Sequence, residues 1–172
     1  MTAATSSLLA QTMVQGSRFS IFYAQGLAGD IPADRWGEMS IPNSNHPAFN
    51  YAHLAIYPNK MFALLGREDL VVEPFFDSEL VNAGSECKDD ASIYPTKDEI
   101  MPYFTERYEA VCAYVETLTA DELGVDNPME GGFKEKFPTL GSAISFMLNN
   151  HIMMHAGQIS AWRRSIGLGS AM

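Results

Sequence analysis

Two histidines spaced four residues apart, His151 and His155, lie inside a long apolar stretch that runs from about residue 139 to residue 166. Residues four apart on an α-helix point in the same direction, so both imidazoles share one helix face. That face reads Ile144, Leu148, His151, His155, Gln158 and Trp162. Burying imidazoles there costs free energy unless they are paired, either by a bound metal ion or by ordinary hydrogen-bond partners. The spacing alone leaves both possibilities open.

A metal site would need a third ligand, because two protein ligands seldom hold an ion alone. His53 is the natural candidate, since it lies near the middle of another predicted helix. Three histidines leave coordination positions free, as in catalytic sites, whereas structural zinc sites are closed by four ligands. A zincin-type protease is not supported, because Ile152 occupies the position of the required glutamate. Imidazole ligation suits zinc, nickel, iron or copper, and the sequence does not choose among these divalent transition metals. Of the four, we expect zinc or nickel.

Helical periodicity without strand patterns predicts an all-α fold, a four-helix bundle with long connections. The expected helices run from about Ser6 to Ala28, from His46-Pro47 to Gly66, from Thr96 to Thr119 and from Thr139 to Gly167. Pro58 should kink the second helix, because proline removes a backbone hydrogen bond. The 67–94 connection could be a lid, a dimer arm or simple packing. Gly131-Gly132 suggests a short β-hairpin between the third and fourth helices. We expect residues 1–172 to form a single domain.

Composition narrows the possible partners. The formal net charge is -10, with 21 acidic against 11 basic residues, which disfavours binding to nucleic acid. We find no basic run for anionic membranes and no apolar span long enough to cross a bilayer. Cys87 and Cys112 lie far apart and lack motif spacing. We therefore expect free thiols, which suit a protein of the reducing cytoplasm. The last helix is apolar on more than one side, and we therefore expect a homodimer.

Several other polar residues are weaker candidates for the site. Tyr57 follows His53 by one turn and could donate a hydrogen bond to a substrate, although an ordinary core tyrosine is the alternative. His46 could lie at the rim of the pocket or cap the second helix. Gln158 could orient a metal ligand or bridge two helices by hydrogen bonds.

Arg163 and Arg164 stand near the end of the last helix. Arginine pairs can bind a carboxylate or a phosphate. Basic side chains at a helix C-terminus also complement the helix dipole, which is the more economical interpretation.

The combined pattern resembles the DinB-like superfamily. The resemblance rests on His53-Leu54, His151-x-x-x-His155-x-Gly157-Gln158-Ile159 and Arg163-Arg164-x-x-Gly167. It extends in helix order over most of the chain and in residue pattern around His53 and from about residue 142 to 167. Pro58 and the 67–94 connection depart from the family pattern, and both could reshape the mouth of a pocket.

The resemblance implies a metal-binding four-helix bundle, often dimeric, with the metal triad at His53, His151 and His155. Characterised members of that superfamily include thiol S-transferases, mycothiol-dependent maleylpyruvate isomerases and some hydrolases. Many other members have no known reaction.

We therefore expect a metal-dependent enzyme that acts on a small molecule, as a hydrolase or a thiol S-transferase. A metal ion held by neutral imidazoles is a Lewis acid that could activate a bound water or hold a thiol as thiolate. The sequence names no general base. The alternatives are a non-catalytic bundle that binds a metal or small ligand, and a structural protein with histidines in its core.

Overall fold

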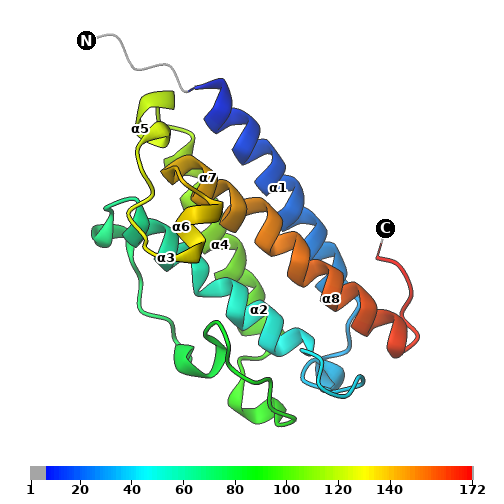
Figure 1. Ribbon diagram of the computed structural model, residues 1–172. Helices are drawn as coiled ribbons and strands as arrows, with labels where there is room; N and C mark the ends of the chain where they lie inside the picture. Colours follow the sequence, from blue (N-terminus) through cyan, green and yellow to red (C-terminus); the bar gives the residue numbers. More distant parts are fainter. Residues whose placement is uncertain (1–6, 172) are drawn as a thin grey trace.

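The computed structural model describes residues 7–171, and their regular structure is almost entirely helical. Four long helical segments dominate: α1 (Leu8–Gly29), α2 (Pro47–Ala55) with α3 (Tyr57–Leu64), α4 (Lys97–Val115), and α7 (Leu140–Ser145), which continues through the π-helical segment η5 (Phe146–Asn150) into α8 (His151–Ser165). They close into a ring, because α1 and α2 each pack against both α4 and α8 (Figure 1). The all-α prediction is confirmed.

Local chemistry of the sequence sets the ends of these helices. The hydroxyl of Ser7 accepts a backbone N–H of the first turn of α1. Ser6, where we placed the start of this helix, lies outside the described residues. A capping box forms at the predicted start of α4, where the Glu99 carboxylate accepts the Thr96 N–H at 2.9 Å. α4 ends about one turn earlier than predicted, because Thr119 caps a separate short helix with a second capping box.

The second predicted helix is broken into α2 and α3 at Ile56. Pro58 has no N–H to donate to the carbonyl of Leu54, one turn before it. Tyr108 on α4 supplies the missing donor, since its buried hydroxyl donates to the Leu54 carbonyl at 3.1 Å. The Leu54 carbonyl therefore keeps a hydrogen-bond donor despite the break. After the break, α3 leaves the axis of α2 (Figure 1). Gly66, in the left-handed region at φ 67°, ends α3 as predicted.

The predicted hairpin between α4 and α7 does not form. The chain there makes α5 (Ala120–Gly124) and α6 (Gly132–Lys136). Strand pairing in this described segment is limited to one isolated bridge between Asp126 and Thr139. Gly131 has a φ of 72° and directly precedes α6, so the double glycine begins a short helix and not a β-turn.

The connection between α3 and α4 carries three short 3₁₀ turns: η2 (Glu68–Leu70), η3 (Ser78–Val81) and η4 (Ala91–Ile93). Another, η1 (Ala33–Arg35), follows α1. The second turn, η3, packs against α2 and buries Val81. This long segment is thus part of the packed structure along α2.

Apolar side chains lie mainly inside the ring of helices, but several are exposed. On α1 these are Phe19 and Phe22, and on α8 they are Met153 and Met154. Within the described part of the chain, no helix combines the length and apolar character needed to cross a bilayer. The homodimer expected from the apolar character of the last helix stays a prediction.

Arg163 is fully buried and joins α8 to the end of α1. Its guanidinium donates to the Leu27 carbonyl at 2.7 Å and pairs with both carboxylate oxygens of Asp30. The exposed Arg164 bonds to Ser160 in its own helix. Arg163 therefore complements the C-terminal end of α1, not that of α8 where the sequence interpretation placed it.

We expect Arg163→Met to lower the free energy of unfolding by about 2 kcal/mol, because the buried Leu27 carbonyl loses its charged donor. Arg164→Met is the matched control and should stay within about 0.5 kcal/mol of the wild type. Urea denaturation followed by circular dichroism measures both changes. Equal stability of the two variants would contradict the structural role of Arg163.

Candidate metal centre

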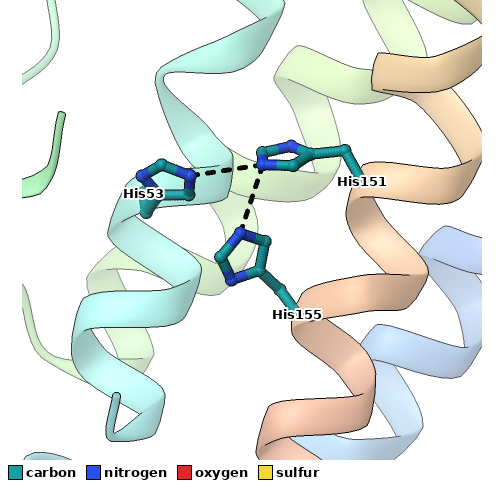
Figure 2. A group of neighbouring side chains, drawn as sticks. All are labelled: His53, His151 and His155. Atoms are coloured by element: carbon teal, nitrogen blue, oxygen red, sulfur yellow. Dashed lines mark hydrogen bonds between the residues drawn. The ribbon is translucent and has the colours of Figure 1, made fainter. Parts of the chain in front are cut away.

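His53, His151 and His155 converge between α2 and α8 (Figure 2). The Nε2 atom of His151 lies 3.3 Å from Nε2 of His53 and 3.1 Å from Nε2 of His155. The three residues are only 6%, 6% and 8% exposed, in sequence order. Three nitrogen atoms from two helices therefore face one buried point, as the sequence predicted.

The position of α8 depends on the segment before it. His151 begins α8 directly after the π-helical turn η5, and such turns are frequent at functional sites. The segment η5 also packs against α1, where Gly16 lies next to it. A Cβ atom at Gly16 would come within 2.7 Å of the side-chain oxygen of Asn149. The absence of a side chain at Gly16 therefore lets α1 approach η5 closely.

The hydrogen bond of His53 fixes its tautomer. Its Nδ1 lies 2.6 Å from the carbonyl oxygen of Val81, in the 67–94 connection. A carbonyl can only accept, so Nδ1 carries the proton and Nε2 presents a lone pair. The sequence could not reveal this partner, because it is a backbone atom that tertiary packing brings to the site.

Asn50 fixes the tautomer of His155 in the same way. Its Nδ2 donates to the carbonyls of Asn45 at 3.1 Å and His46 at 3.3 Å, which sets the orientation of the amide. Oδ1 therefore faces Nδ1 of His155 at 2.7 Å and accepts its proton. Sequence reasoning missed Asn50. The available signal was a polar residue three positions before His53 in an otherwise apolar helix.

These tautomers create a surplus of lone pairs inside the site. Nε2 of His53 and Nε2 of His155 both face His151, which can offer at most one proton between them. Two nitrogen ligands about 2.0–2.1 Å from one tetrahedral ion lie roughly 3.3 Å apart, close to the 3.3 Å and 3.1 Å separations in the structure. The donor set therefore fits a divalent transition metal ion.

Burial also keeps the three imidazoles neutral. Desolvation is the largest of the causes that lower the pKa of His151 to about 3, and the neighbouring His155 and His53 contribute to the same shift. Desolvation likewise lowers the pKa of His155 to about 4 and shifts the pKa of His53 downward. Neutral imidazole is the form that coordinates a metal ion, so the rings need no deprotonation at neutral pH.

A cavity of about 280 Å³ adjoins the histidines. Its lining comprises Asn45, Phe49, His53, Tyr57, Asn82, Ala83, Gly84, Ser85, His151 and His155. Residues 82–85 belong to the 67–94 connection, which also supplies the Val81 carbonyl. The long connection therefore forms part of the candidate site.

The structure places Tyr57 beside the candidate ligands and Gln158 on the exposed surface near His155. The half-buried Tyr57 ring lies 4.1 Å from the His151 ring and 5.0 Å from the His53 ring, between centroids. Burial raises the pKa of its phenol, which stays a hydrogen-bond donor. Gln158 is exposed, accepts a hydrogen bond from Asn45 at 3.3 Å and also interacts with His155.

His46 lies apart from the three clustered histidines. Its Nδ1 accepts the N–H of Phe49 at 3.2 Å and caps α2. Its Nε2 donates to the carbonyl of Lys88 at 3.0 Å. The side chain is fully buried, and it is not among the residues that line the cavity. The structure thus places His46 as a helix cap.

Comparison with known proteins agrees with this arrangement. Residues 23–159 match the family model described as the DinB superfamily, and this range includes all three clustered histidines. Searches of curated proteins and of solved structures found no match. Because the matched range covers most of its length, the chain belongs to the DinB superfamily.

Proposed function

We propose that this protein is a metal-dependent enzyme that acts on a small molecule, as a hydrolase or a thiol S-transferase. His53, His151 and His155 would hold a divalent transition metal ion, zinc or nickel. One observation carries the proposal: three buried Nε2 atoms face one another while two Nδ1 protons are held away from them. Membership of the DinB superfamily and the adjoining cavity support it.

The chain's own residues would position the reacting groups. A bound ion supplies Lewis acidity. The Val81 carbonyl and Asn50 hold two of the imidazoles in the orientation and tautomer that ligation requires. Tyr57 lies at the cavity with a protonated phenol, which is suited to donate a hydrogen bond to a substrate.

A non-catalytic binding module is the second candidate function. The lining of the 280 Å³ cavity contains no carboxylate and no lysine, so no residue there stands out as a general base. A protein that only sequesters a metal or small ligand needs no such residue. Turnover of ester or thiol substrates by the metal-loaded protein distinguishes an enzyme from a binding module.

We expect protein purified without a histidine tag to contain about one divalent ion per chain, and His151→Ala to lose it, because two imidazoles seldom hold an ion. Mass spectrometry of the metal content measures this. His46→Asn is the matched control: it replaces a buried histidine outside the cluster by another good helix cap and should keep the ion. Equal metal content in wild type and His151→Ala would remove the basis of the site.

We expect Asn50→Ala to weaken metal affinity about 10- to 100-fold, because His155 loses the acceptor that holds its Nδ1 proton. Competition with a chromophoric chelator measures the affinity. Asn149→Ala is the control, since its amide also donates to two backbone carbonyls but has no bond to the histidines. If both variants bind metal equally well, Asn50 has only a structural role.

A further inference from the structure

A second and larger cavity, of about 610 Å³, lies next to the histidine cavity. Its lining comprises Tyr57, Lys60, Ala63, Leu64, Ala83, Pro128, Met129, Phe133 and Met147. Tyr57 and Ala83 also line the histidine cavity, so the two spaces adjoin at these residues. The volume falls in the range of small-molecule sites, about 300–1,000 Å³. We call this larger space the groove.

One face of α3 forms much of the groove. Tyr57, Lys60 and Leu64 follow at spacings of three and four residues, so they share a side of the helix. The break at Pro58 turns this face away from the line of α2. Met129 and Phe133, from the segment between α4 and α7, supply apolar surface. The groove is therefore suited to an apolar molecular body.

Lys60 is the single charged residue among the nine that line the groove. Its ammonium group donates to the side-chain oxygen of Asn82 at 3.1 Å and lies 4.8 Å from the centre of the Tyr57 ring. Tyr57 and Asn82 both line the histidine cavity, so this cation lies where the two spaces meet. Ion pairs among the described residues do not involve Lys60.

Glu79 acts electrostatically on Lys60 but does not form an ion pair with it, so the ammonium group can still pair with a ligand anion. The chain carries a formal net charge of -10, so most of its surface disfavours anionic ligands. Lys60 lies close enough to the histidine cavity to bond to Asn82 and to contact the Tyr57 ring, and both of these residues line that cavity. A ligand carboxylate beside Lys60 would therefore stand next to the candidate metal ligands, with its apolar body in the groove.

We propose that the substrate class of this protein is small carboxylic acids with an aromatic or alkyl body, bound in the groove with the carboxylate at Lys60. The inference deepens the proposed function, because the groove adjoins the same three-histidine centre. Specificity would then come from the apolar lining and from one charge, while the histidines contribute the chemistry. The binding itself does not require a metal ion.

The test compares 4-phenylbutyrate with its neutral amide by isothermal titration calorimetry, using chelator-treated protein. We expect the carboxylate to bind more tightly than the amide. Lys60→Met keeps the aliphatic stem and should weaken carboxylate binding about three- to tenfold without affecting the amide. Lys136→Met, on the exposed end of α6 and outside the lining, is the matched control and should change neither affinity.

Ala63→Phe places a large side chain in the groove and should abolish binding of both probes. Ala63 is exposed, so the change leaves the core intact, and urea denaturation verifies this. The proposal is overturned if the two probes bind equally, if Lys60→Met binds both as the wild type does, if Ala63→Phe still binds them, or if neither probe binds the wild type. The proposed metal site is tested separately by the metal content of the purified protein. Wild-type protein that contains no metal but still binds the carboxylate would contradict the metal site and leave the groove proposal standing.

Discussion

The arrangement of the site depends on the placement of two protons. The Nδ1 protons of His53 and His155 are held by Val81 and Asn50, so lone pairs point into a buried space. Unpaired polar groups in such a space cost free energy, and a shared cation removes that cost. The hydrogen bonds that orient the rings therefore also create the electrostatic demand for an ion. In the proposed metal site, ring orientation and ion affinity would come from the same contacts.

The surrounding helices satisfy their own polar groups by contacts between distant parts of the chain. Tyr108 completes the hydrogen bonding that Pro58 interrupts, and Arg163 closes the end of α1 from within α8. Gly16 allows α1 to lie close to η5, directly before the first histidine of α8. Each contact fixes one helix relative to another, and α2 and α8 supply the histidines. The precision of the cluster thus depends on packing well outside it.

Much of the fold and of the histidine cluster could be predicted from the sequence, because hydrophobic periodicity and helix-ending residues such as proline and glycine are local signals. The four helical segments, the break near Pro58 and the pairing of His53 with the 151/155 histidines all follow from spacing or family pattern. The contact of the Val81 carbonyl with His53 could not be predicted, because every residue has a backbone carbonyl and tertiary packing decides which one meets the ring. The hairpin prediction failed because Gly131 permits a left-handed residue in a helix start as readily as in a turn. Asn50 does carry a sequence signal, because it is a polar residue in an otherwise apolar helix.

The break at Pro58 places the candidate ligand His53 and the α3 residues that line the groove on two separate helices. In a continuous helix, a shift of one set would also move the other. Before the break, α2 carries a candidate ligand whose position must hold to a fraction of an ångström. After it, α3 presents side chains to a neighbouring space. Tyr57 still packs against the His53 ring, but the later residues of α3 are separated from that imidazole by the break. Under the proposed function, selectivity would vary with residues on α3 while the three-histidine centre stays constant. Homologous chains that differ on α3 would then take different molecules.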